Sequence, residues 1–163
     1  ASGNTLKAIN DIVGNVNVFG VDNSLPMINQ AKCNAPSATL IHSDSFPSQF
    51  GKFNGILCNW TLQFIRPDVR WDYLQQMVNH LKDNGLLILT EKTTQSPENK
   101  KLYHLWKQNN GMTEQDILEK NERLKNVLIT MPIEEYHTHF KKLNLSYNII
   151  HAEYGFITWV LKK

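Results

Sequence analysis

The chain contains a series of short, largely apolar runs, and each of them ends at a polar residue. The runs, each with the residue that follows it, are 16–21 and Asp22, 39–43 and Asp44, 53–58 and Asn59, and 86–90 and Glu91. Strands that are apolar throughout, rather than at every second position, are typical of a parallel sheet covered by helices on both faces. This feature predicts an α/β fold.

Helical patterns separate the apolar runs. Residues 24–32 are predicted to form one helix, and Pro67 suits the first turn of the next. The apolar face of this second helix has spacings of three and four, and it consists of Leu74, Met77, Val78 and Leu81. The pair Asn84-Gly85 is predicted to end that helix before the strand at 86–90.

The second half of the chain is more polar. Its predicted helices are 98–110, 113–127 and 132–143. The second of them begins with a capping pattern of Thr113 and Asp116. The end of the chain predicts two antiparallel strands joined by a tight turn at Tyr154-Gly155. No repeat or linker is visible, so a single domain spanning residues 1–163 is predicted.

Composition excludes several kinds of site. A net charge of +2 does not indicate direct nucleic-acid binding, and no apolar run approaches the length of a membrane span. Cys33 and Cys58 match no zinc or redox spacing, which predicts free thiols in a reducing cytoplasm. His137 and His139 lie two apart on a predicted helix and point to opposite faces, so no metal site is predicted. No catalytic triad, carboxylate pair or glycine-rich phosphate loop is visible, and no catalytic residue is assigned.

The polar residues at the strand ends are the candidate ligand-binding residues, because ligands of open α/β sheets bind at the carboxyl edge. An acidic residue there, about 20 residues beyond a glycine turn, can accept hydrogen bonds from both ribose hydroxyls of a nucleotide. Asp22 follows Gly3 at this spacing. Asp22 can also cap the helix at 24–32, and the binding role is favoured. Asp44 either binds an adenine amino group or turns the chain.

Asn59 directly follows an apolar strand, where an amide needs hydrogen-bond partners. These partners are either backbone groups or a ligand, and the residue alone favours the backbone. Trp60, Leu62 and Phe64 are expected to lie in the core or in the wall of a pocket.

The segments GVDNSLPMINQAK, HSDSF, CNWTLQFIRP, LLILTEK and NGMTEQDILEKNERLKNVLIT occur in this order. In this order they resemble the class I S-adenosylmethionine-dependent methyltransferases. More narrowly, they are similar to the carboxy-S-adenosylmethionine synthases of bacterial wobble-uridine modification in tRNA. The resemblance implies a Rossmann-like fold whose mostly parallel sheet ends in an antiparallel strand pair. It also implies that the first strand of the fold is missing from this chain.

The same resemblance implies a binding site for S-adenosylmethionine. Asp22 would bind the ribose hydroxyls with Asn23 beside it, and Asp44 with Ser45 would meet the adenine. Asn59 would face the methionine part and the sulfonium. Gly3 resembles the last glycine of the first motif of the family, and the preceding part of that motif is absent here.

One position departs from the family pattern. The family places an arginine in the helix after NG, where it binds the carboxylate of carboxy-S-adenosylmethionine across a dimer interface, and Asn121 stands at this position. An amide cannot form the charged, bidentate pair that a guanidinium forms with a carboxylate. Lys125, one helical turn further on, is expected to reach the same side.

The resemblance implies that prephenate supplies a carboxyl group to S-adenosylmethionine, which yields carboxy-S-adenosylmethionine and phenylpyruvate. It also implies a cytoplasmic homodimer. Two alternatives stay open: an ordinary methyltransferase acting on a small molecule or tRNA, which Asn121 favours, and a non-catalytic binding module.

Overall fold

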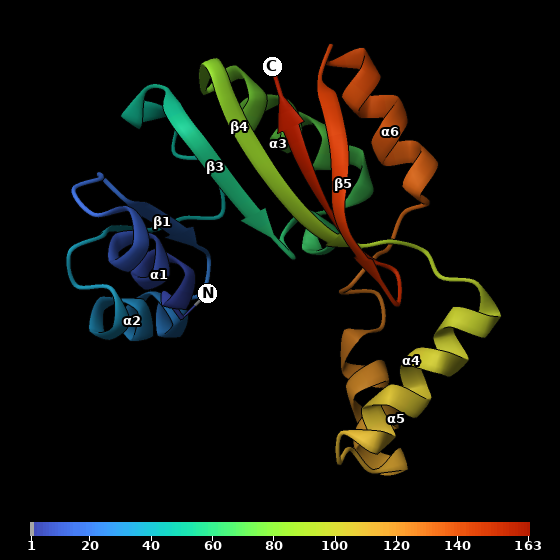
Figure 1. The fold of residues 1–163 in the computed structure, drawn as a ribbon. Helices are drawn as coiled ribbons and strands as arrows, with labels where there is room; N and C mark the ends of the chain where they lie inside the picture. Colours follow the sequence, from blue (N-terminus) through green and yellow to red (C-terminus); the bar gives the residue numbers. More distant parts are fainter. Residues whose placement is uncertain (1) are drawn as a thin grey trace. The chain divides into compact units, whose positions relative to one another are not determined.

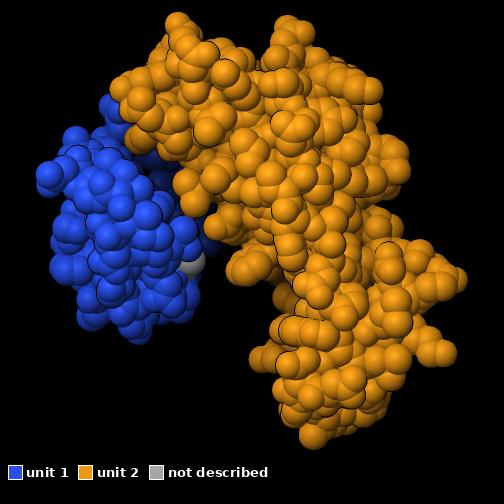
Figure 2. All heavy atoms as spheres, viewed as in Figure 1, with its two compact units in different colours: residues 1–50 blue, residues 51–163 orange. Residues whose placement is uncertain are grey.

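The computed structural model describes residues 2–163. The chain divides into two compact units, residues 1–50 and 51–163, which Figure 2 shows in blue and orange. Each unit has its own sheet and is described by itself. The prediction of a single domain stays a prediction.

Unit 1 is a small two-layer α/β unit. Its elements are α1 (Asn4–Val13), β1 (Phe19–Asp22), α2 (Leu25–Asn34), β2 (Thr39–His42) and the 3₁₀ turn η1 (Ser48–Phe50). The strands β1 and β2 are parallel, and Asp22 lies opposite His42 at their carboxyl ends. The predicted strand at 16–21 begins three residues late, at Phe19, and the predicted parallel pairing is confirmed.

Unit 2 contains a four-stranded sheet (Figure 1). Its elements are β3 (Phe53–Asn59), η2 (Leu62–Phe64), α3 (Pro67–Asn79), β4 (Leu81–Lys92), α4 (Pro97–Asn109), α5 (Glu114–Leu124), α6 (Ile133–Lys142), β5 (Ser146–Glu153) and β6 (Phe156–Lys162). The strand order is β3-β4-β6-β5, with β3 and β4 parallel and the other two pairs antiparallel. This mixed sheet confirms the predicted α/β class with a C-terminal antiparallel pair.

The start of β4 differs from the prediction. Helix α3 ends at Asn79, and Leu81 already belongs to β4, where its side chain is fully buried. The pair Asn84-Gly85 therefore does not end the helix. It lies in an irregular part of β4, because the pairing with β3 jumps between Phe53 and Gly55, and Asn84 has a φ of 61°. An asparagine tolerates this left-handed conformation, so the extra residues loop out of the ladder.

One face of the unit 2 sheet forms the core. Helices α3 and α6 supply Leu74, Met77, Tyr136 and Phe140, and Trp159 of β6 packs among them with no exposed surface. The rings of Tyr136 and Trp159 stack with their centres 5.1 Å apart. The four residues that carried the helical pattern are thus all buried as expected, although Leu81 lies in β4 and not in α3.

Helix α6 confirms the expectation that His137 and His139 point apart. The indole Nε1 of Trp159 donates to Nε2 of His137 at 3.1 Å, which fixes one histidine against the sheet. The ring of His139 stacks on Trp71 of α3 at 3.9 Å between centres. Both histidines therefore have structural roles.

Two local predictions are confirmed at chain turns. The Oγ1 atom of Thr113 accepts from the Asp116 amide at 3.1 Å and Oδ2 of Asp116 accepts from the Thr113 amide at 2.9 Å, which is a capping box at the start of α5. Tyr154 and Gly155 have φ angles of 47° and 77°, as a tight hairpin between β5 and β6 requires.

Candidate functional site

The turn after β3 is held in place by Glu91, which lies fully buried near the end of the neighbouring strand β4. Its Oε1 accepts from the amides of Thr61 and Leu62 at 3.0 and 2.8 Å, and its Oε2 accepts from the Gln63 amide at 2.8 Å. Burial raises the pKa of the Glu91 carboxyl to about 7, against the opposing effect of these three amides and of Arg70. Glu91 lies at a predicted ligand-binding strand end, but its carboxylate fixes the backbone of the turn instead.

The backbone of this turn explains why its aromatic residues are not in the core. The Trp60 amide donates to the Thr90 carbonyl at 2.7 Å, and Trp60 has a φ of 53°. Its side chain is 56% exposed and that of Phe64 is 47% exposed, so the expectation of a core position is wrong for both. Leu62 is fully buried, as expected. Trp60 instead lines a pocket, which was the other expectation for it.

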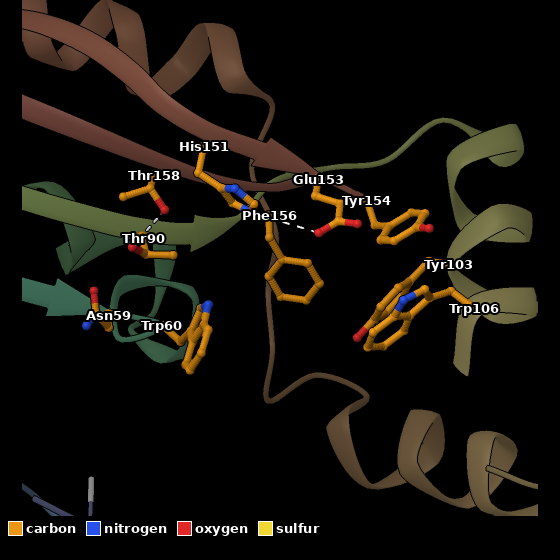
Figure 3. A pocket seen from close by; sticks show the side chains of 10 residues that line it. All are labelled: Asn59, Trp60, Thr90, Tyr103, Trp106, His151, Glu153, Tyr154, Phe156 and Thr158. Atoms are coloured by element: carbon orange, nitrogen blue, oxygen red, sulfur yellow. Dashed lines mark hydrogen bonds and ion pairs between the residues drawn. The ribbon is translucent and has the colours of Figure 1, made fainter. Parts of the chain in front are cut away.

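Asn59 ends β3 with an exposed side chain. The premise that this amide is buried and needs partners is therefore wrong. The backbone carbonyl of Asn59 accepts from Oγ1 of Thr61 at 3.2 Å. The side chain lines a hollow of about 470 Å³ within unit 2 (Figure 3).

The floor of this hollow is polar. Three strands contribute Thr90, Thr158, His151 and Glu153, all from the sheet face opposite the core. The hydroxyls of Thr90 and Thr158 lie 3.1 Å apart, and Nε2 of His151 lies 3.9 Å from Oε2 of Glu153 (Figure 3). These groups can form hydrogen bonds with a polar ligand.

The far wall of the hollow is aromatic. In Figure 3, Tyr103 and Trp106 project from α4, and Tyr154 and Phe156 from the hairpin between β5 and β6. The ring of Tyr103 lies 5.8 Å from Trp106, 5.7 Å from Tyr154 and 5.5 Å from Phe156, measured between centres. Such a wall buries a flat or cyclic ligand group on apolar surface while the polar floor orients it.

Unit 1 brings its own predicted site residues to one sheet edge. Oδ1 of Asp22 accepts from the Ser24 amide at 2.8 Å, and the Ser43 amide donates to the Asp22 carbonyl at 3.1 Å. The carboxylate thus bonds the residue at the start of α2, where a capping role was the alternative to binding, and its position at the carboxyl end of β1 is the predicted one.

The neighbouring residues of this edge are exposed. Asn23, Asp44 and Ser45 have exposed side chains, and Nε2 of His42 lies 3.1 Å from the Asn23 carbonyl. The Ser45 amide donates to Oγ of Ser43 at 3.1 Å, which forms the turn after β2. Asn23, Asp44 and Ser45 are therefore accessible to a ligand.

Gly3 has a packing role at the start of α1. It has a φ of 86°, and a Cβ atom at this position would lie 2.9 Å from the Cα of Ala31 in α2. Only glycine combines this conformation with so close a helix contact. The resemblance gave Gly3 a cofactor role, which stays a prediction.

The two residues at the predicted carboxylate position differ in structure. Asn121 lies on α5 with an exposed side chain. Lys125 follows the end of α5, with a ψ of 128°, and its Nζ lies 3.5 Å from Oε2 of Glu122. Lys125 is the residue that caps the end of α5, and its reaching the same side as Asn121 stays a prediction. Neither residue lines the hollow.

The aromatic wall was not identified from the sequence. Tyr103 and Trp106 are spaced three apart on α4, a spacing that places both on one face of a helix. Their partners Tyr154 and Phe156 lie about 50 residues away in the chain, and only the fold brings them together.

The structure contains neither a metal cluster nor a membrane-spanning helix in the part that it describes. Among residues 2–163, no three His, Cys, Asp or Glu side chains are placed to hold a metal ion. In the same range, every helix is too short or too polar to cross a membrane.

Known structures share the fold. The plantazolicin methyltransferase BpumL superposes with a TM-score of 0.73 at 12% identity, over 99% of this chain and 73% of that one. An O-methyltransferase family 2 protein from Planctomyces limnophilus superposes with a TM-score of 0.67 at 13% identity, over 100% of this chain and 48% of that one.

Sequence comparisons are more specific. Residues 1–85 match a family model described as a methyltransferase domain. Carboxy-S-adenosyl-L-methionine synthase from Helicobacter hepaticus is 32% identical, over 100% of this chain and 73% of that protein. The protein of the same name from Campylobacter concisus is 35% identical, over 83% of this chain and 62% of that protein. The chain spans 56% to 66% of the length of three such relatives. It belongs to the carboxy-S-adenosyl-L-methionine synthase family, within the class I methyltransferase fold.

Proposed function

We propose that the protein is an S-adenosylmethionine-binding transferase that makes carboxy-S-adenosylmethionine. Prephenate transfers its ring carboxyl group to the activated methyl carbon, the methyl proton leaves with the ring hydroxyl of prephenate as water, and the ring becomes that of phenylpyruvate. The product serves wobble-uridine modification of tRNA. The observation that carries the proposal is the hollow beside Asn59, which has an aromatic wall and a polar floor, in a chain of this family.

The proposal assigns cofactor roles to residues of unit 1. Asp22 binds the ribose hydroxyls, with Asn23 beside it, and Asp44 and Ser45 bind the adenine. The position of Asp22 at the carboxyl end of β1 and the accessible side chains of the other three support this assignment. Gly3 contributes the close backbone packing of the first motif.

Asn59 faces the methionine part and the sulfonium in this proposal. Its exposed side chain at the end of β3 supports the role, because an amide oxygen can accept and an amide nitrogen can donate to the polar groups of an amino acid. The adjoining hollow then receives the carboxyl donor. Within this proposal the reaction depends on placing two reactants side by side and on stabilising charge.

The test incubates the complete gene product with S-adenosylmethionine and prephenate and follows the cofactor by mass spectrometry. A product heavier by one carboxyl group supports the proposal. Intact cofactor binding without this product contradicts carboxyl transfer.

A second candidate function is ordinary methyl transfer to a small molecule or tRNA. Asn121 favours it, because the amide replaces the arginine that the family places there. Methylation of an acceptor without prephenate would support this candidate. Calorimetry with S-adenosylmethionine separates both enzymes from a non-catalytic module, which would give no heat of binding.

The proposed protein is a cytoplasmic homodimer. The support is that the chain belongs to a family of bacterial synthases, and the resemblance to this family implies a dimer. Analytical ultracentrifugation of the complete protein tests the dimer.

A further inference from the structure

Four polar residues form one row across the sheet of unit 2. Asn59 of β3 lies opposite Thr90 of β4. Thr90 lies opposite Thr158 of β6, which in turn lies opposite His151 of β5. Residues directly opposite each other on neighbouring strands have their side chains on the same face. The row therefore lies on one face of the sheet, and all four of its residues line the hollow (Figure 3).

A β-bulge brings His151 into this row. Ile149 pairs with Trp159, so a regular antiparallel ladder would place Ile150 opposite Thr158. The pairing instead skips Ile150, and His151 takes the position opposite Thr158. Bulges re-aim side chains in this way and are frequent next to active sites. The strand thus places an imidazole, and not an isoleucine side chain, on the floor of the hollow.

The hydrogen-bonding groups of the row suit a hydroxyl. The hydroxyls of Thr90 and Thr158 lie 3.1 Å apart, and the hydrogen bond between them uses the hydrogen of only one, so the other hydroxyl can donate to a ligand. The imidazole of His151 can donate from one ring nitrogen and accept at the other. A ligand hydroxyl, which both donates and accepts, can therefore bond to Thr158 and His151 at the same time.

The charge of the floor also favours a hydroxyl over an acid group. Glu153 lines the hollow, and its Oε2 lies 3.9 Å from Nε2 of His151. A carboxylate of a ligand placed here would meet this like charge, whereas a neutral hydroxyl would not. The other three residues of the row carry no charge.

The aromatic wall adjoins the same end of the row. Phe156 and Thr158 are two residues apart on β6, so their side chains lie on one face, about 7 Å apart along the strand. The ring of Tyr103 lies 5.5 Å from that of Phe156. A ligand ring that packs on Phe156 and Tyr103 therefore has one edge next to Thr158.

We propose that Thr158 and His151 bind the ring hydroxyl of a small cyclic acid whose ring packs on Phe156 and Tyr103. This contact selects the acid over an analogue without the hydroxyl. The identity of the acid rests on the proposed function, in which prephenate carries such a hydroxyl and phenylpyruvate does not. The contact itself has a test that does not require turnover.

The test compares 4-hydroxyphenylpyruvate with phenylpyruvate, which differ only in a ring hydroxyl. Calorimetry measures the binding of each to the complete protein with S-adenosylhomocysteine present. The parent should bind the hydroxylated acid about tenfold more tightly, as expected for a net hydrogen bond or two. His151→Leu and Thr158→Val should each reduce this ratio at least about threefold and leave phenylpyruvate binding within about twofold of the parent.

Two further variants show that the change is specific. His151→Gln keeps a hydrogen-bonding side chain and should retain most of the ratio. Asn148→Leu is the matched control, because Asn148 is exposed on the same strand and face, opposite Val160, and does not line the hollow. It should keep the ratio of the parent. Circular dichroism and melting temperature establish that each variant is folded, and Thr158→Val carries the test if His151→Leu does not fold.

The outcomes separate the inference from the proposed function. If the ratio depends on His151 and Thr158 and the parent forms no carboxylated cofactor, the hydroxyl contact stands and the proposed reaction fails. If the parent forms the product and both variants keep its KM for prephenate, the contact is wrong and the reaction stands. The contact is also wrong if the parent binds the two acids equally or binds neither at millimolar concentration. Equal loss of both acids in His151→Leu, or loss of the ratio in Asn148→Leu, overturns it as well.

Discussion

Glu91 and Lys92 are adjacent in the chain and lie in opposite environments. Glu91 is buried in the core face of the sheet, where three amides surround it, and Nζ of Lys92 lies 5.1 Å from the centre of the Tyr103 ring on the other face. The turn that carries Asn59 and Trp60 depends on Glu91, because its carboxylate satisfies the amides of the next three residues. A buried acid therefore positions the entrance of the candidate site.

The raised pKa of Glu91 predicts a pH-dependent stability. In the unfolded chain its pKa is near the ordinary 4.5 and in the folded protein about 7, so the folded state binds its proton more tightly. The contribution of the proton to stability is fully present below pH 4.5 and is lost as the pH rises through 7. The free energy of unfolding should fall by about 2 kcal/mol between pH 5.5 and pH 8.

Urea denaturation at the two pH values measures this effect. Glu91→Gln is the control, because it cannot titrate, and its difference between pH 5.5 and pH 8 should be smaller than that of the parent. Equal differences in the two proteins would assign the pH dependence to other groups.

Replacing Asn59 by alanine is expected to weaken S-adenosylmethionine binding without changing the stability of the fold. Its side chain is exposed, so Asn59→Ala should change the free energy of unfolding by no more than about 0.5 kcal/mol. The same variant should weaken S-adenosylmethionine binding several-fold, measured by calorimetry on the complete protein. Unchanged affinity would show that Asn59 has no role in binding.

Asp22 offers a conservative test in unit 1. Asp22→Asn keeps the oxygen that accepts from the Ser24 amide and removes the charge that ribose hydroxyls would meet. The melting temperature without ligand should stay near that of the parent. The rise in melting temperature with S-adenosylmethionine should shrink, because stabilisation by a ligand follows its affinity. Asp11→Asn, at an exposed helix pair with Lys7, should leave that rise unchanged.

At the scale of elements, the predicted helices and strands were recovered because their patterns are local. The face of α3, the capping box of α5 and the hairpin after β5 each depend on residues a few positions apart. The predicted end of α3 is wrong because an Asn-Gly pair can end a helix and can also lie in an irregular part of a strand, as it does in β4. Leu81 likewise fits both an apolar helix face and a buried strand. The exposure of Trp60 follows from a left-handed backbone that no local pattern predicts.

The hairpin between β5 and β6 provides a prediction at this scale. Gly155→Ala should be destabilising for two reasons, because Gly155 has a φ of 77° and an added Cβ would meet the buried side chain of Gln95. Gly111→Ala has a similar φ of 88° and open space around the added atom. It should cost only about 1–2 kcal/mol of backbone strain.

Urea denaturation of the two variants gives the difference. Gly155→Ala should be the less stable by roughly 1 kcal/mol or more. A Gly155→Ala variant as stable as Gly111→Ala would mean that Gln95 moves aside without cost.

At the scale of the whole molecule, two units each place candidate residues at the carboxyl ends of their strands. The sequence identified these strand ends, and it missed the aromatic wall, since Tyr103 and Phe156 meet only through the fold of unit 2. The family assignment was reached from short segments distributed along the chain, and the sequence comparisons confirm it.

The irregular start of β4 and its regular end differ in how well they tolerate the insertion or deletion of a residue. Residues 82–85 already loop out of the ladder with β3, so a codon gained or lost there is absorbed by the loop. A residue inserted between Leu86 and Thr90 would shift the register of the following residues by one, so that each of their side chains would point to the other face of the sheet. The ammonium group of Lys92 would then enter the core, and the carboxylate of Glu91 would face the aromatic wall. Natural length variation in this strand should therefore be confined to its first residues.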